Sequence, residues 1–139
     1  MKKNVPVSEI MTKQVVTIKP SDGLYEAEKL FNRHGIRHIP VVEKDHIVGV
    51  ISHSDLLRIS FSDLDEHDDR VVPIIYDMYS IPQVMTKVPV SVEVTTTIKE
   101  TAEILARQSF HSLPVVDNGK LVGIVTTTDL INYLLEQYE

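Results

Sequence analysis

The chain has 139 residues, of which 42% are hydrophobic, and a formal net charge of −6; this size suits one compact domain or two small units that share a core. The acidic balance argues against a general nucleic-acid binder, which would show a basic face, and the absence of cysteine excludes disulfides and thiolate chemistry. No apolar run approaches the roughly 20 residues that span a bilayer, and the N-terminus lacks a signal-peptide core, so we expect a cytoplasmic protein with no membrane partner.

Each half of the chain predicts the same order of elements. In the first half, a β-branched run at 15–18 predicts a short strand, and apolar positions at helical spacing predict a helix over 22–34. Residues 39–42 and 47–51 predict two strands joined by a turn, followed by a second helix at about 53–60. In the second half, Ile98, Ala102 and Leu105 mark a helix, the turn at 117–120 suits positive φ, and a last helix covers about 127–137.

The two halves are copies of one repeat. A shift of 74 residues lays 10–57 over 84–131 without a gap. We therefore predict a first repeat at 1–60, a linker at 61–80 that is acidic and then apolar, and a second repeat at 81–139. A strand–helix–strand–strand–helix unit cannot bury both sheet faces alone, so we expect an α+β fold in which the copies pack together. The identities that set the register include Met11-Thr12-Lys13 with Met85-Thr86-Lys87, Pro40-Val41-Val42 with Pro114-Val115-Val116, and Asp55-Leu56 with Asp129-Leu130.

A polar motif opens the last helix of each copy. Ser52-His53-Ser54-Asp55 and Thr126-Thr127-Thr128-Asp129 both fit S/T-x-x-D. The structural interpretation is a capping box, in which the first side chain and the acid satisfy backbone N–H groups. The functional interpretation is that the Asp accepts hydrogen bonds from two vicinal hydroxyls, as on a ribose, beside a helix N-terminus that favours phosphate.

A second polar cluster precedes each Pro-Val-Val strand. It contains Arg37 and His38 in the first copy, and His111 and Ser112 in the second. Such residues could equally be exposed polar side chains that bind no ligand. Basic groups at the edge of a presumed cleft in an acidic protein would, however, favour an anion such as phosphate.

These motifs resemble paired CBS domains, the Bateman module. The resemblance rests on the Ile10-Met11-Thr12 and Val84-Met85-Thr86 openings, the Pro-Val-Val strands, the Val-Gly strands and the S/T-x-x-D helix starts, and it covers about 5–137. It implies two βαββα CBS repeats packed sheet to sheet with pseudo-twofold symmetry. Such modules often bind AMP, ADP, ATP or S-adenosylmethionine between the copies, frequently form homodimers and signal to a regulated protein.

The resemblance also implies two ligand pockets, each built from both copies. The strand residues and Ile36 or Phe110 would enclose the base, each Asp would take the ribose hydroxyls, and Arg37, His38, His111, Ser112 and His53 would face phosphates. One pocket would join Val50, Ser52, Ser54 and Asp55 to Pro89, Val90, Phe110 and His111. The other would join Ile124, Thr126, Thr128 and Asp129 to Val15, Val16, Ile36 and Arg37.

The sequence departs from the family's nucleotide motif in both copies. His38 replaces the usual Ser or Thr, and Ser109 replaces the usual Gly. Because Phe110 and Pro89 would narrow the first pocket, we favour the Asp129 pocket. The alternative is a ligand-free dimerisation module that acts through protein contacts alone. We expect no enzyme activity and no metal site, because no histidine pair has ligand spacing on a helix and no catalytic triad or phosphate-binding glycine loop is present.

Overall fold

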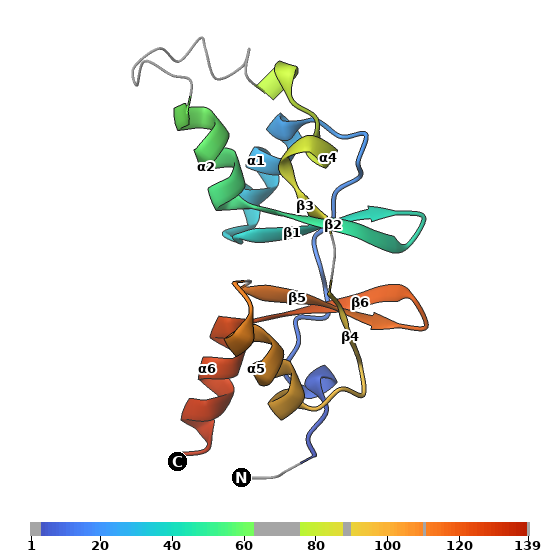
Figure 1. The fold of residues 1–139 in the computed structure, drawn as a ribbon, viewed down its shortest axis with the longest axis vertical. Helices are drawn as coiled ribbons and strands as arrows, with labels where there is room; N and C mark the ends of the chain where they lie inside the picture. Colours follow the sequence, from blue (N-terminus) through green and yellow to red (C-terminus); the bar gives the residue numbers. More distant parts are fainter. Residues whose placement is uncertain (1–3, 63–75, 88–89, 110, 139) are drawn as a thin grey trace. The chain divides into compact units, whose positions relative to one another are not determined.

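The computed structural model describes residues 4–62, 76–87, 90–109 and 111–138 (Figure 1). Most of the predicted linker, residues 63–75, lies outside these ranges. The chain forms two compact units, which are considered separately. The first-repeat unit comprises Val16–Pro89, and the second-repeat unit comprises Met1–Val15 together with Val90–Glu139.

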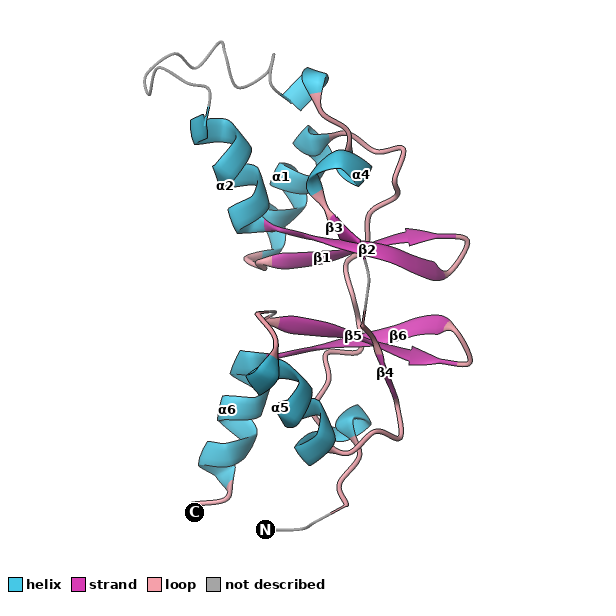
Figure 2. Cartoon of the chain, viewed as in Figure 1, coloured by secondary structure: helices cyan, strands magenta, loops and turns pink. Residues whose placement is uncertain are grey.

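The first-repeat unit is a three-stranded antiparallel sheet with helices on one of its faces (Figure 2). Its strands lie in the order β1-β2-β3. The core contains Leu24 and Phe31 of the first helix against Ile39, Val41 and Ile51 of the sheet. The elements are α1 (Leu24–His34), β1 (His38–Glu43), β2 (His46–Ser52), α2 (His53–Ser62), α4 (Ile81–Val84) and β3 (Thr86–Lys87).

The second-repeat unit has the same helices-on-one-face arrangement around a sheet of order β4-β5-β6 (Figure 2). Here β4 runs parallel to β5, and β5 pairs with β6 in the antiparallel sense. Val7, Leu113, Val115 and Val125 are fully or almost fully buried in its core. The elements are the 3₁₀ helix η1 (Val7–Glu9), β4 (Val92–Glu93), α5 (Ile98–Arg107), β5 (Ser112–Asp117), β6 (Lys120–Thr126) and α6 (Thr127–Glu136).

The strand register confirms the internal duplication. In β1 and β2, His38 lies opposite Ser52, and in β5 and β6, Ser112 lies opposite Thr126, which is the same pair displaced by 74 residues. Both hairpins also shift register at equivalent places, after Val41 and after Val115. The α+β class and the two repeats are thus confirmed, and the sheet-to-sheet packing stays a prediction.

Local sequence explains where the helices start and stop. α1 ends at Gly35, whose φ of 61° is a left-handed conformation that glycine adopts without a Cβ clash. α5 starts at Thr97, whose hydroxyl oxygen accepts a hydrogen bond from the Glu100 N–H at 3.0 Å. α5 buries Thr101 completely, with its hydroxyl donating to the Thr97 carbonyl at 2.9 Å, whereas the predicted Ala102 is only half-buried.

The strand predicted at 15–18 does not form. Only Ile18 makes a bridge, in parallel with Val41. The Ile18 N–H donates to the Pro40 carbonyl at 3.1 Å, and its carbonyl accepts from Val42 N–H at 2.8 Å. Hydrogen bonds on the two sides of one residue are too few to make a strand, although the β-branched composition favours one.

Each unit is completed by the segment that precedes the other repeat. Thr12 pairs with Ile124 of β6, and Thr86 pairs with Val50 of β2. The sulfur of Met11 lies over Gly123, and that of Met85 lies over Gly49, so both methionines fill the space between a leading turn and a sheet. The compact units therefore have other boundaries than the predicted sequence repeats. Each unit takes its leading segment from the chain that precedes the other repeat.

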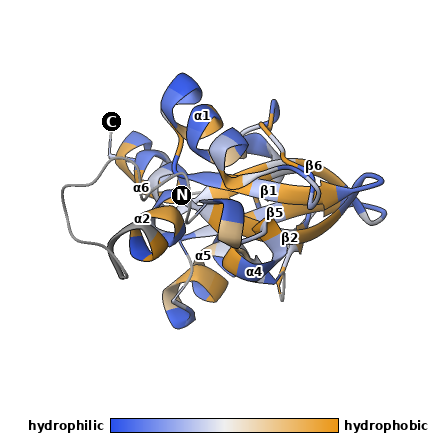
Figure 3. Cartoon of the chain, turned by 90° about the horizontal axis from the view of Figure 1, so that it is seen from above, coloured by the Kyte–Doolittle hydropathy of each residue, from blue (hydrophilic) through white to orange (hydrophobic). Residues whose placement is uncertain are grey.

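The hydropathy of the sheets matches the burial of their side chains. Figure 3 shows hydrophobic colour along β1, β2 and β5, and hydrophilic colour at the hairpin turns. Among the helices that the described ranges contain, none combines the length and apolar content needed to cross a bilayer.

Candidate functional site

In each unit, the hairpin brings the two predicted polar clusters together. The His53 N–H donates to the Arg37 carbonyl at 2.8 Å, and the equivalent Thr127 N–H donates to the His111 carbonyl at 3.0 Å. Residues 16 apart in sequence therefore meet at one end of the hairpin, beside the start of α2 or α6. We call Arg37, His38, Ser52, Ser54 and Asp55 the Asp55 half-site, and His111, Ser112, Thr126, Thr128 and Asp129 the Asp129 half-site.

Both S/T-x-x-D motifs form capping boxes, as the structural interpretation predicted. The Thr126 N–H donates to Oδ2 of Asp129 at 2.9 Å, and the Asp129 N–H donates to the Thr126 hydroxyl at 3.1 Å. Ser52 and Asp55 make the same two bonds at 2.9 and 3.1 Å. Each carboxylate is thus fixed on the first helical turn, and one of its two oxygens is already used by the backbone.

The second carboxylate oxygen differs between the half-sites. Oδ1 of Asp55 accepts a hydrogen bond from the guanidinium of Arg58, one turn along α2. Oδ1 of Asp129 has no hydrogen-bond partner within the described residues. Asp55 is also the more buried of the two, at 6% exposure against half-burial for Asp129. The sequence prediction missed Arg58, although its three-residue spacing from Asp55 is the spacing of a helical ion pair.

Around Asp55, the predicted polar residues lie close together, whereas His53 packs on an apolar side chain. The Ser52 and Ser54 hydroxyls lie 3.2 Å apart, Arg37 is exposed, and His38 opens β1. The His53 ring packs edge-on against Phe31 with centroids 5.5 Å apart, so in this structure it is a packing group. Ile36, Val50 and Val16 are half-buried in the same unit.

Around Asp129, Ser112 and Ile124 are buried, whereas His111 and Thr128 are exposed. Val15 and Val90 belong to the same unit and are half-buried. Pro89 and Phe110 lie outside the described residues. The pockets drawn across the two repeats, including any meeting of Arg37 with Asp129, stay a prediction.

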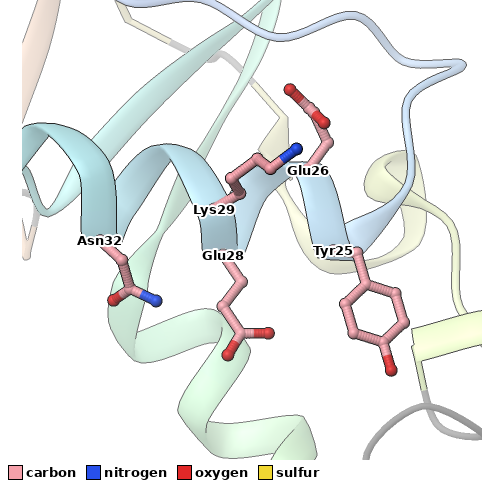
Figure 4. Close-up of a pocket in the computed structure, with 5 residues that line it drawn as sticks. All are labelled: Tyr25, Glu26, Glu28, Lys29 and Asn32. Atoms are coloured by element: carbon pink, nitrogen blue, oxygen red, sulfur yellow. The ribbon is translucent and has the colours of Figure 1, made fainter.

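A surface hollow lies elsewhere, on α1 (Figure 4). Partial burial, followed by the carboxylates of Asp77 and Glu28, raises the pKa of the Tyr25 phenol, so this group stays neutral near pH 7. The hollow contains no predicted site residue, and all its lining comes from one helix. Its residues are Tyr25, Glu26, Glu28, Lys29 and Asn32. Among the described residues, no three His, Asp or Glu side chains gather as metal ligands would.

Comparison with known proteins identifies the repeat. The family model described as CBS domain matches residues 7–62 and again 81–136. A CBS domain-containing protein of Dictyostelium discoideum is 30% identical over 139 residues, which cover 97% of this chain and 94% of that protein. An uncharacterized protein of Methanocaldococcus jannaschii is 31% identical over 132 residues, and an inosine-5′-monophosphate dehydrogenase of Korarchaeum cryptofilum is 30% identical over 119. The chain spans 43% and 22% of the lengths of these two relatives, while they match 94% and 85% of the chain.

Solved structures of CBS pairs have the same fold. CBSX2 of Arabidopsis thaliana is 26% identical with a TM-score of 0.83, and the match covers 98% of both chains. A structure of CBSX2 in complex with AMP is 28% identical with a TM-score of 0.79, covering 97% of this chain and 99% of that one. A CBS domain pair in complex with 5′-methylthioadenosine and S-adenosyl-L-methionine, at 23% identity and a TM-score of 0.78, is similar in fold alone. The duplicated hairpin with its capped helix, matched twice by one family model, places this chain in the CBS-domain family as a tandem pair.

Proposed function

We propose that this protein is a regulatory module that binds an adenosine-containing ligand and passes the binding signal to a partner protein. The observation that carries the proposal is the Asp129 carboxylate. One of its oxygens is held by the Thr126 N–H, and the other has no partner among the described residues. This carboxylate is therefore oriented by the helix start and still able to accept hydrogen bonds.

The chemistry of the Asp129 half-site suits a ribose with an attached anion. A carboxylate accepts hydrogen bonds from vicinal hydroxyls, and charge-assisted bonds of this type are stronger than neutral ones. The start of α6 carries the positive end of a helix dipole, and His111 and Ser112 lie beside it because Thr127 bonds to the His111 carbonyl. AMP bound by CBSX2, a protein of the same fold at 28% identity, supports an adenine nucleotide as the ligand class.

Binding is proposed to regulate rather than to catalyse. The match to the dehydrogenase covers 22% of that enzyme, so it supports no activity for this chain. To regulate, the ligand must bind one arrangement of the protein better than another, because equal affinities shift no equilibrium. The predicted placement of the base between residues of both repeats would provide this difference.

Thermal unfolding with AMP, ADP, ATP and S-adenosylmethionine tests the proposal. A ligand at 100 times its dissociation constant adds about 2.7 kcal/mol of stability, which raises Tm by roughly 9 °C in a chain of this size. Asp129→Asn keeps an oxygen that can accept the Thr126 N–H but removes the charge and the second acceptor. We expect it to weaken binding by at least about ten-fold, the loss typical of a charged hydrogen bond, with Tm of the free protein nearly unchanged.

Asp117→Asn provides the matched control, because this exposed carboxylate at the end of β5 takes part in neither capping box. Its ligand affinity should equal that of the parent protein. No Tm shift with any of the four ligands, or equal binding by Asp129→Asn and the parent, contradicts the proposal.

A homodimer is the second part of the proposal. α6 buries no residue of its own, and Ile131, Leu134 and Leu135 are exposed along one face at helical spacing, with the exposed Tyr138 just beyond the helix. The equivalent helix α2 also exposes an apolar side chain, Leu57, at the position that matches Ile131. Each unit thus has an equivalent helix with exposed apolar residues, and such a repeated feature suits a symmetric contact with a second copy of the chain. The same apolar face favours the alternative function, a dimerisation module without ligand, which a panel of flat melting curves would support.

A further inference from the structure

We propose that Arg58 is a specificity-determining residue that competes with ligand for Asp55 and makes the two half-sites unequal. The proposal rests on the proposed function, since it assumes that the Asp carboxylates accept hydrogen bonds from the ligand. It goes further by assigning a role to a residue that the repeat motif does not contain.

The competition follows from the number of free acceptors. Oδ2 of Asp55 is occupied by the Ser52 N–H at 2.9 Å, and Oδ1 is engaged by the Arg58 guanidinium. A pair of hydroxyls can reach full hydrogen bonding with Asp55 only by displacing Arg58 or sharing its oxygen. At Asp129 the corresponding oxygen has no partner within the described residues, so a ligand displaces none of the described side chains there.

The difference is encoded at one pair of equivalent positions. The 74-residue shift lays Arg58 over Asn132, which is exposed on α6 three residues after Asp129. An uncharged, shorter Asn cannot form the ion pair. The two half-sites otherwise have the same capping box with the same bond lengths.

Arg58 is free to be displaced without loss of the fold. Its side chain is 71% exposed, whereas the Asp55 side chain is 9% exposed. Ion pairs with one exposed partner contribute little to stability because water and salt screen them. The energetic effect of Arg58 is therefore expected mainly in ligand binding, where it lowers the availability of Asp55.

Reciprocal exchange of the two residues tests the proposal, with AMP as the probe and isothermal titration calorimetry as the measurement. In an Asp129→Asn background, the remaining binding reports on the Asp55 half-site, and adding Arg58→Asn should tighten it about five-fold, the size of an exposed ion pair. In an Asp55→Asn background, adding Asn132→Arg should weaken binding at the Asp129 half-site by a similar factor. Arg58→Lys keeps the charge and should stay within about two-fold of the parent.

The titrations are repeated with adenosine, which lacks phosphate. Tightening by Arg58→Asn for both adenosine and AMP supports competition for Asp55. Unchanged affinity, or weaker AMP binding with unchanged adenosine binding, overturns it, the latter because Arg58 would then be a phosphate ligand. If AMP binds the parent protein at the Asp129 half-site while the exchanges have no effect, this inference fails and the proposed function stands.

Discussion

The two glycines that face the methionines show how closely the leading segments approach the sheets. At Gly123, a Cβ would lie 2.9 Å from the Thr12 carbonyl oxygen and against the Met11 sulfur. At Gly49, a Cβ would lie 2.9 Å from the Thr86 carbonyl oxygen and against the Met85 sulfur. A flexible methionine can move aside, but a backbone carbonyl that belongs to a β-bridge cannot move without breaking the pairing.

Gly123→Ala should therefore destabilise the protein by about 1–3 kcal/mol, the usual effect of overpacking a close contact. Urea unfolding followed by circular dichroism measures this change. Gly23→Ala is the control, because a Cβ at that position meets no atom within 4 Å. Equal stability of the Gly123 and Gly23 variants would contradict the close approach described here.

At the residue scale, the sequence predicted the capping boxes but could not predict the contact between Arg58 and Asp55. The S/T-x-x-D motif is local, so its hydrogen bonds follow from helix geometry alone. Whether Arg58 reaches Asp55 or extends into water depends on a rotamer choice that spacing permits but does not decide. The same limit applies to His53, whose packing on Phe31 depends on how α1 and α2 meet.

The two hairpin turns have positive φ at equivalent positions but use different residues there. Asn118 and Gly119 have φ of 52° and 84°, and Lys44 and Asp45 have φ of 51° and 69°. Positive φ at both central positions is the requirement that Asn-Gly meets best. In the first repeat, two ordinary side chains occupy the strained conformation.

Asp45→Gly should stabilise the protein by about 1 kcal/mol, since it removes the Cβ penalty of a left-handed residue. The reciprocal Gly119→Asp should destabilise it by a similar amount. Chemical denaturation of the two variants checks the opposite signs. Changes of the same sign would show that the two turns are not equivalent.

The elements formed from hydrogen bonds close in sequence were predicted best. Both helix pairs and both hairpins lie within a few residues of their expected bounds. The run at 15–18 failed as a strand because it bonds to β1 only on the two sides of Ile18. The equivalent segment of the second repeat does form a strand, the two-residue β4, because two of its residues pair in parallel with β5. Local sequence does not predict how many such long-range pairs will form.

At the scale of the whole molecule, the exposed face of α6 predicts self-association. Leu135→Glu places a charge in the middle of this face, at a side chain that is 59% exposed, so the fold should persist while the dimer dissociates. Analytical ultracentrifugation over a range of concentrations gives the mass. Met78→Glu is the control at a 66% exposed apolar residue outside α6. A monomeric parent protein, or a dimeric Leu135→Glu variant, contradicts the predicted contact.

The duplication could be read from the sequence because equivalent residues keep their order and spacing. The exchange of leading segments could not, because Met11 and Met85 occupy equivalent positions and sequence alone does not say which glycine each one covers. Packing decides this, and it assigns Met11 to Gly123 and Met85 to Gly49.

This exchange makes the two repeats interdependent in folding and in evolution. Residues 5–12 complete the second repeat, and residues 81–87 complete the first, so neither repeat contains all of its own unit. Two identical chains of one repeat each would complete themselves by swapping these segments, as domain-swapped dimers do. Fusing two such chains into one would turn an association that depends on concentration into a permanent one, after which each copy is free to diverge, as Arg58 and Asn132 have done.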